Sequence, residues 1–145
     1  MPNNKCYTEA GFLLDTHVWL WLNTGSPELK KNTIQLIDDA AKEGKLYIPA
    51  ICVWEIAILV AKKRIILQTP LAEWIHEAIT QKGVSLAELN IEIMIESSQL
   101  PDGIHGDPAD RLIVATSRIK RIPILTRDDK ILNYANSGYV QAFKV

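Results

Sequence analysis

The sequence has too few cysteines for a disulfide-stabilised fold or a cysteine-ligated metal site. Only two occur in its 145 residues, Cys6 and Cys52, and they lie far apart. Cys6 belongs to a polar segment, whereas Cys52 stands in an apolar run, so we expect a surface thiol and a core residue, respectively. Cysteine spacing therefore predicts neither a disulfide framework nor a structural zinc site.

Long hydrophobic runs are also lacking. The most apolar stretch, residues 46–61, contains Pro49 and Glu55 and is too short and too polar to cross a bilayer. The first ten residues are polar and lack the apolar core of a secretion signal. We therefore expect no membrane span and a cytoplasmic protein, in which residues 1–10 form a polar leader and residues 11–145 form one domain.

Neither sign of charge is in excess, since 16 Lys and Arg residues oppose 17 Asp and Glu residues for a formal net charge of −1. That balance argues against a protein that coats nucleic acid through bulk positive charge. Three glycine-containing motifs are missing as well: the phosphate loop of nucleotide triphosphatases, the dinucleotide fingerprint and the serine-hydrolase elbow. With 48% apolar residues along the whole chain, disorder is excluded and a sizeable core is expected.

What is present is an alternation of short apolar runs with amphipathic segments. Ser26 and Pro27 fit the N-cap and first position of one helix, which Gly44 ends. An apolar helix ends at residues 62–64, and further helices are expected over 69–83, 90–99 and 109–119 and from about residue 128. Strands are expected at residues 11–14, 46–50, 84–89, 122–126 and 139–143. This order predicts an α/β fold in which helices cover both faces of an open, mostly parallel sheet.

Acidic residues recur where these strands end. Because ligands bind beyond the carboxyl ends of the strands in such sheets, these acids form a candidate site. They are Asp15, Glu55, Asp107, Asp110, Asp128 and Asp129.

Helix capping is an alternative explanation for most of them. Asp107-Pro108-Ala109-Asp110 fits an N-cap, a proline at N1 and an acid at N3. Thr126-Arg127-Asp128-Asp129 fits a capping box that leaves Asp128 at N2 beside the helix dipole. Asp15 or Thr16 fits the cap of a helix over residues 18–22. For these acids, capping and a role in a site both remain open.

Glu55 has no such explanation. It is the only charged residue between Leu46 and Ala61, in a helix whose apolar residues cover every face and predict extensive burial. A buried carboxylate needs a cation, hydrogen bonds or a proton. A bound metal is the simplest partner, and an all-oxygen ligand set favours Mg²⁺ or Mn²⁺. Such ions commonly promote hydrolysis at phosphorus, so phosphodiester or phosphate hydrolysis is the predicted chemistry.

Four segments of the sequence resemble the four acidic blocks of PIN-domain ribonucleases, and most of all the VapC-like toxins of bacterial type II toxin–antitoxin pairs. They are Leu13-Leu14-Asp15-Thr16-His17-Val18-Trp19-Leu20-Trp21, Val53-Trp54-Glu55-Ile56-Ala57, Asp107-Pro108-Ala109-Asp110-Arg111-Leu112-Ile113-Val114-Ala115-Thr116 and Leu125-Thr126-Arg127-Asp128. The resemblance covers residues 11–145. It implies a three-layer α/β/α sandwich with a central, mostly parallel sheet, Mg²⁺- or Mn²⁺-dependent endoribonuclease activity, a homodimer, and a small antitoxin that blocks the site.

The same resemblance assigns roles to individual residues. Asp15 and Asp110 are expected to hold the metal directly, while Glu55 completes the ligand set or holds a water. Asp128 binds a second metal or orients ligands. Asp107 is the first alternative ligand, because it lies three residues from Asp110, and Asp129 is a similar alternative to its neighbour Asp128.

Expected RNA contacts are Thr126, Arg111, Arg127 and His17. Six basic residues between Arg111 and Lys130 indicate either an RNA-backbone track or a solvated helix face. The four tryptophans, which could stack bases, stand at helical spacing among aliphatic residues and are expected in the core or a dimer interface.

Two other functions fit parts of the sequence. A haloacid-dehalogenase-like phosphatase would use Asp15 and Asp128-Asp129, but its first motif needs a second aspartate where His17 stands. A non-catalytic module of the same fold tends to lose acids, whereas all four positions are filled here. Without the six acids of the candidate site, 11 acids face 16 bases, so an acidic site within a net basic remainder is expected.

Overall fold

A five-stranded parallel sheet forms the centre of the molecule. The computed structural model describes residues 9–104 and 106–145. The strands are β1 (Phe12–Leu14), β2 (Leu46–Pro49), β3 (Val84–Ala87), β4 (Ile124–Thr126) and β5 (Ala142–Lys144), in the spatial order β3-β2-β1-β4-β5. Every pair of neighbours is parallel. The expected α/β class with a parallel sheet is therefore confirmed.

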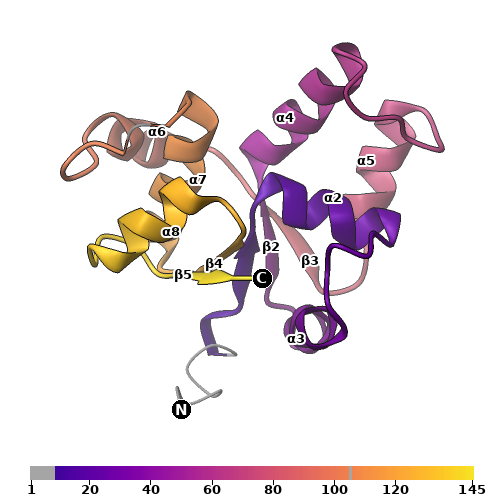
Figure 1. Cartoon of the computed structure of the whole chain (residues 1–145), viewed down its shortest axis with the longest axis horizontal. Coiled ribbons are helices and arrows are strands. Elements are labelled where there is room, and N and C mark those ends of the chain that lie inside the picture. The colour runs from indigo at the N-terminus through magenta and orange to yellow at the C-terminus, as the bar shows by residue number, and fades with distance from the viewer. Residues whose placement is uncertain (1–8, 105) are drawn as a thin grey trace.

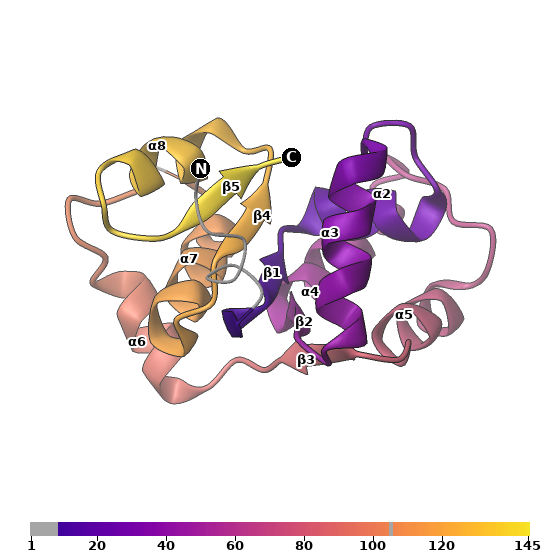
Figure 2. The same cartoon turned by 90° about the horizontal axis from the view of Figure 1, so that it is seen from below.

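Helices cover both faces of this sheet. They are α2 (Thr16–Thr24), α3 (Lys31–Lys42), α4 (Ala50–Ala61), α5 (Leu71–Ile79), α6 (Ile91–Ser98), α7 (Pro108–Lys120) and α8 (Asp129–Asn136). Figure 1 shows α2 to α5 on one side of the strands and α6 to α8 on the other, and Figure 2 shows the same two groups from below. Right-handed crossovers place the helices in this way when the strand order reverses between β1 and β4. The result is a three-layer α/β/α sandwich.

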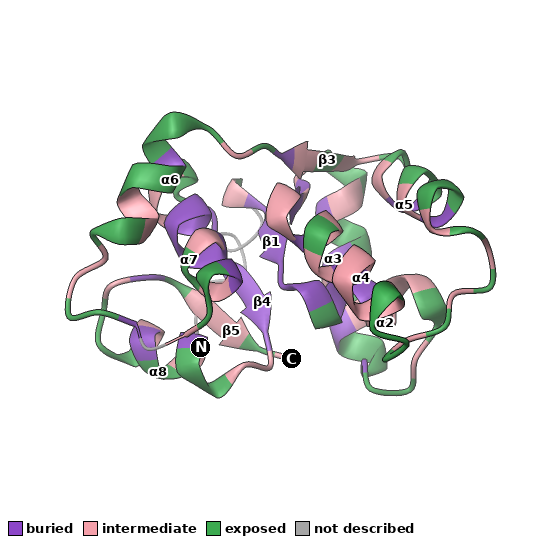
Figure 3. Cartoon of the chain, turned by 90° about the horizontal axis from the view of Figure 1, so that it is seen from above, coloured by how far each residue is buried: buried purple, intermediate pink, exposed green. Residues whose placement is uncertain are grey.

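The core is built on the neighbouring strands β1 and β4, which are buried along their whole length (Figure 3). Leu13, Leu14 and Ile124 are fully buried, and Trp19 packs beside them in one hydrophobic cluster. Gly11 precedes β1 with a φ of 77°, and a Cβ there would lie 2.0 Å from the carbonyl oxygen of Lys45. Only glycine allows β1 to approach the start of β2 so closely.

The expected start of α3 is wrong. The Ser26 hydroxyl accepts a hydrogen bond from the Glu28 amide within a turn (3.2 Å), and α3 begins at Lys31 without a side-chain cap. Leu29 is buried in the core from the turn that precedes the helix. The turn brings Leu29 into the core, and the helix begins two residues later at Lys31.

The expected burial of α4 is also wrong. Only Cys52 and Ile56 are buried along this helix, and Trp54 is 57% exposed. The helix contacts α2, α5, α7 and β2, and most of its other residues are only partly buried. An apolar sequence on all faces therefore does not give a fully buried helix.

Cys52 is buried as expected. The prediction of a surface thiol at Cys6, and most of the predicted leader, lie outside the described residues. Within the described ranges, no helix is long and apolar enough to cross a membrane.

Candidate active site

Five carboxylates line one cavity of about 330 Å³ at the carboxyl ends of the central strands. The carboxylates are Asp15, Glu55, Asp107, Asp110 and Asp128; Thr16, His17, Trp21 and Arg127 complete the lining. The cavity lies where the strand order reverses between β1 and β4, the usual ligand position in an open parallel sheet.

Asp15 is the most deeply placed of the five. Leu14 pairs with Leu125 in the sheet, so the next residues, Asp15 and Thr126, emerge together at its edge. The Thr126 hydroxyl donates to Asp15 Oδ2, and the His17 amide donates to Oδ1 at 3.1 Å. Burial raises the pKa of Asp15, although these two hydrogen bonds oppose the increase. Asp15 is also the N-cap of α2, as one alternative expected.

Asp128 enters the cavity from the turn after β4. Its Oδ1 accepts hydrogen bonds from the amides of Lys130 (2.8 Å) and Ile131 (3.1 Å), so Asp128 is the N-cap of α8. The expected capping box of Thr126 and Asp129 is therefore wrong. Thr126 instead accepts a hydrogen bond from the Asp128 amide (2.9 Å) while it donates to Asp15.

Glu55 is half-buried and reaches the cavity from α4. Its Oε1 accepts a 2.5 Å hydrogen bond from the hydroxyl of Thr16, which also lies 3.2 Å from the Cys52 sulfur. Burial is the main cause of its raised pKa, and the carboxylates of Asp107 and Asp15 add to the increase. Thr16 thus links the β1 end of the cavity to the helix that follows β2.

Asp107 and Asp110 come from the start of α7. Asp107 is the N-cap, and its Oδ1 accepts a hydrogen bond from the Asp110 amide at 3.0 Å, as the capping interpretation expected. Asp110 has a pKa raised to about 7, first by burial and then by the charges of the other four carboxylates. The five acids line one cavity, and their mutual repulsion when charged contributes to the raised pKa of Asp110.

Arg127 is the only Lys or Arg residue in the lining. Its guanidinium lies 4.6 Å from the centre of the Trp21 ring and donates to the Glu28 side chain, to the Glu28 carbonyl (2.5 Å) and to the Val145 carbonyl (2.9 Å). The His17 ring lies 5.8 Å from that of Trp21. A fixed cation and two aromatic rings therefore form one wall of an otherwise acidic cavity.

Several expected residues do not line the cavity. Asp129 is exposed outside it, and Arg111 donates to the Ile104 carbonyl (3.3 Å). Thr126 is fully buried and contacts Asp15. Arg118 pairs with Glu96 near the other end of α7, far from the acids. The expected basic track is thus reduced at this site to Arg127.

The donor chemistry of the cavity fits a divalent cation. Every carboxylate offers hard oxygen ligands, and five of them face one fixed arginine. Within residues 9–104 and 106–145, no three His, Cys, Asp or Glu side chains already form a metal-binding group. Three of the acids hold helix N-caps, so side-chain movement would be needed for these carboxylates to surround one ion.

Two residues gain importance only in three dimensions. Thr16 was considered as a cap, yet its hydroxyl contacts a carboxylate 39 positions away. Trp21 was expected in the core or an interface, yet it lines the cavity beneath Arg127. Local sequence carries no signal for either contact, because both depend on how distant segments meet.

Comparisons with known proteins agree with this architecture. The family model of the PIN domain matches residues 12–137. Ribonuclease VapC22 of Mycobacterium tuberculosis (strain ATCC 25618 / H37Rv) is 30% identical over 122 residues, which cover 84% of this chain and 90% of that protein.

Solved structures share the fold at lower sequence identity. The VapBC2 structure from Rickettsia felis, bound to a DNA fragment from its promoter, aligns with a TM-score of 0.66 at 13% identity and covers 92% of this chain and 97% of that chain. FitAcB from Neisseria gonorrhoeae aligns with a TM-score of 0.62 at 23% identity and covers 91% and 96%, respectively.

Proposed function

The chain belongs to the PIN-domain family, and on this premise we propose that it is a metal-dependent endoribonuclease that acts as the toxin of a type II toxin–antitoxin pair. The observation that carries the proposal is the cavity in which Asp15, Glu55, Asp107, Asp110 and Asp128 meet. The curated relative named as a ribonuclease, similar over most of both chains, supports the substrate class.

The residues of the cavity divide the work of hydrolysis. Asp15 and Asp110 would hold Mg²⁺ or Mn²⁺, with Glu55 and Asp128 completing the set and Asp107 as an alternative ligand. The bound ion would neutralise phosphate charge and lower the pKa of the attacking water. Thr126 and Thr16 orient Asp15 and Glu55 through their hydroxyl groups.

Arg127 and His17 stand where a phosphate on the rim of the cavity would be bound. The guanidinium forms an ion pair with the Glu28 carboxylate and also contacts the Val145 carbonyl and the Trp21 ring, so its donors are already oriented before a phosphate binds. Arg111, further from the acids, would contact more distant RNA.

A small antitoxin protein is the proposed regulatory partner, and the cytoplasm the proposed location. Support comes from structural neighbours that are VapBC and FitAcB assemblies. A homodimer is proposed as well, and the exposed apolar side chains of α4 and α6 support it: Trp54, Ile91, Met94 and Ile95 are each about half exposed or more.

Cleavage of a labelled RNA mixture in Mg²⁺ or Mn²⁺ tests the enzymatic part. We expect fragments with the wild-type chain, none in EDTA, and at least a hundredfold loss in Asp15→Asn and Asp110→Asn. Asp129→Asn is the matched control, since Asp129 lies outside the cavity, and should keep wild-type activity. Intact RNA under all metal conditions would reject the proposal.

Induced expression tests the toxin role. We expect growth arrest when the chain is expressed alone and normal growth when the adjacent reading frame is expressed with it. The Asp110→Asn variant should be harmless in both cases. Normal growth with the active chain alone would contradict the toxin role without affecting the enzymatic one.

A further inference from the structure

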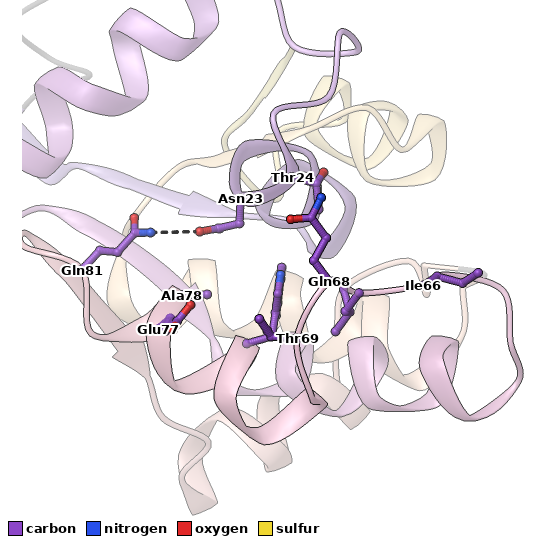
Figure 4. Close-up of a pocket in the computed structure, with 10 residues that line it drawn as sticks. Asn23, Thr24, Ile66, Gln68, Thr69, Glu77, Ala78 and Gln81 are labelled. Atoms are coloured by element: carbon purple, nitrogen blue, oxygen red, sulfur yellow. Dashed lines mark hydrogen bonds between the residues drawn. The ribbon is translucent and has the colours of Figure 1, made fainter.

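A second cavity, of about 310 Å³, lies between the end of α2, helix α5 and the segment that joins α4 to α5 (Figure 4). Asn23 and Thr24 contribute from α2, Gln68 and Thr69 from the joining segment, and Trp74 from α5. None of its lining residues belongs to the acidic cavity. The functional proposal above therefore leaves this cavity unexplained.

The rim of this cavity is rich in side-chain amides. Asn23, Gln68 and Gln81 each supply one. The Asn23 amide is already engaged: its nitrogen donates to the Trp19 carbonyl at 2.9 Å, and its Oδ1 accepts from the Gln81 amide at 3.2 Å, the bond drawn in Figure 4. Glu77 is the only charged residue in the lining. The absence of Lys and Arg from these lining residues disfavours phosphate, whereas paired donors and acceptors suit a neutral polar molecule.

The inner wall of the cavity is aromatic and includes one hydroxyl without a hydrogen-bond partner among the described residues. Trp74 is 8% exposed, and its ring lies 5.4 Å from that of the fully buried Trp19. Among the described residues, the two buried side-chain polar atoms without a hydrogen-bond partner are Trp19 Nε1 and Thr69 Oγ1. Thr69 lines the cavity and Trp19 packs on its wall. Trp19 is outside the lining, so only the Thr69 hydroxyl can be reached from the cavity. Because buried polar atoms are nearly always paired, this hydroxyl indicates a polar ligand.

We propose that this cavity binds a nucleobase. Proteins commonly bind unpaired bases with an aromatic side chain beside amide groups. The base packs against the aromatic ring, and the amides form hydrogen bonds with the edge of the base. Thr69 and Glu77 add a hydroxyl and an acceptor for the amino or imino groups of a base. A phosphate or an aliphatic molecule would leave either the amides or the aromatic wall without a suitable contact.

The base comes from the RNA substrate, and this part of the proposal rests on the proposed ribonuclease function. Helix α2 connects the two cavities, since Asp15 caps its start and Asn23 and Thr24 lie in its last turn. Nine helical residues span about 13 Å. A base bound here therefore belongs to a nucleotide a few positions away from the cleaved phosphate, and the cavity contributes to the choice of cleavage site.

Nucleosides test the cavity without reference to cleavage, because they carry no phosphate. The metal-free ¹⁵N-labelled protein is titrated with adenosine, guanosine, cytidine, uridine and, as control, ribose. We expect saturable shifts of the side-chain amide signals of Asn23, Gln68 and Gln81 with at least one nucleoside and none with ribose.

Variants then identify the contact. Gln68→Ala should weaken nucleoside binding about two- to tenfold, the effect of one lost hydrogen bond. Gln35→Ala is the matched control, an exposed glutamine on α3 outside the cavity. Unchanged cavity signals with all four nucleosides, or shifts confined to the acidic cavity, would overturn the proposal.

Cleavage kinetics distinguish the source of the base. With RNA, Gln68→Ala should raise KM and leave kcat unchanged, and an abasic nucleotide at the bound position should remove the difference between wild type and variant. Nucleoside binding with no effect on KM would support the nucleobase cavity but assign it to free nucleosides. If RNA is not cleaved at all, the function proposed above fails, and the titration still decides this inference.

Discussion

Asp15 shows how single residues set the properties of the acidic cavity. Its carboxylate is 7% exposed and is held between the Thr126 hydroxyl and the His17 amide. A carboxylate in this position is costly unless donors or a cation stabilise its charge. Thr126 is therefore a positioning residue for Asp15, and it also contacts the Asp128 amide.

Replacing Thr126 tests this arrangement. Thr126→Val keeps the shape but removes the donor to Asp15, so metal affinity and cleavage rate should fall about 10- to 100-fold, as for other supporting contacts of metal ligands. Thr126→Ser keeps the hydroxyl and should restore most of the activity. Metal titration and cleavage rates provide the measurements. Equal losses in the two variants would show that the hydroxyl group alone does not account for the role of Thr126.

The raised pKa of Asp110 makes stability depend on pH. Below its ordinary pKa of 3.8 the carboxyl group is protonated in both the folded and the unfolded chain. Between 3.8 and about 7 only the unfolded chain releases the proton, so the free energy of unfolding falls as pH rises, and above about 7 the loss is complete. Asp15 and Glu55, whose pKa values are also raised, act in the same direction.

Urea unfolding in EDTA between pH 5 and pH 8.5 measures this effect. The wild-type chain should lose stability over this range, Asp110→Asn should show a shallower decrease, and Mn²⁺ should restore wild-type stability at pH 8. Asp129→Asn should follow the wild type. Identical pH profiles for Asp110→Asn and the wild type would show that Asp110 does not share the repulsion described above.

At the scale of elements, three helix N-termini converge on the cavity. Asp15, Asp107 and Asp128 are the N-caps of α2, α7 and α8. The positive ends of these helices stabilise the carboxylate charges and favour an approaching phosphate. Capping and membership of the site are therefore not alternatives for these three residues.

Two strands begin where a glycine lies close to another segment of the backbone, Gly11 beside Lys45 and Gly83 beside Ala41. A substitution at Gly83 tests this arrangement. Gly83 precedes β3 with a φ of 83°, and a Cβ there would lie 1.7 Å from the Ala41 carbonyl oxygen. Gly25 has a similar φ of 64° but open space around it. Gly83→Ala should lower the free energy of unfolding by about 3 to 5 kcal/mol, the range of severe backbone conflicts.

Gly25→Ala is the matched control for Gly83→Ala. It meets the same positive φ without the overlap, so its cost should be about 1 to 2 kcal/mol. Chemical denaturation of both variants gives the comparison. Equal costs would show that the approach of α3 to β3 relaxes freely.

Sequence patterns predicted these elements well where the signal was local. The cap at Asp107, the helix from Asn90 to Gln99 and the alternation of strands and helices are all confirmed. The cap of α8 was assigned wrongly because Thr126 matches a capping box, but its hydroxyl bonds to a carboxylate 111 positions away. Contacts of that range cannot be read from neighbouring residues.

At the scale of the whole molecule, the distribution of charge is more informative than the net charge of −1. The acids meet at the carboxyl ends of the strands, while Arg118 lies in the last turn of α7 and Arg121 is its C-cap. The four acidic blocks predicted carboxylates that line one cavity, because the order of these blocks along the chain follows the strand ends. The second cavity could not be predicted, since its amides come from three separate segments without a common motif.

Substitutions in the exposed apolar surface test the proposed homodimer, which concerns the whole molecule. Trp54 on α4 and Met94 on α6 are 57% and 49% exposed, and Figure 1 shows the two helices on opposite sides of the sheet, both toward the upper edge of the view. We expect a dimer in sedimentation experiments at micromolar concentration and a monomer for Met94→Glu. Ile66→Glu, at a 94% exposed position on the joining segment, should remain dimeric. A monomeric wild-type chain would contradict the proposal.

The chemical nature of the RNA ends tests the central proposal most directly. Hydrolysis by a water that a divalent ion activates requires no 2′-hydroxyl participation, so the products should carry 5′-phosphate and 3′-hydroxyl ends. Mass spectrometry of fragments made by the wild-type chain in Mn²⁺ should find these ends, and neither EDTA-treated protein nor Asp110→Asn should produce fragments. Fragments with 2′,3′-cyclic phosphate ends that persist in EDTA would contradict a metal-dependent carboxylate site.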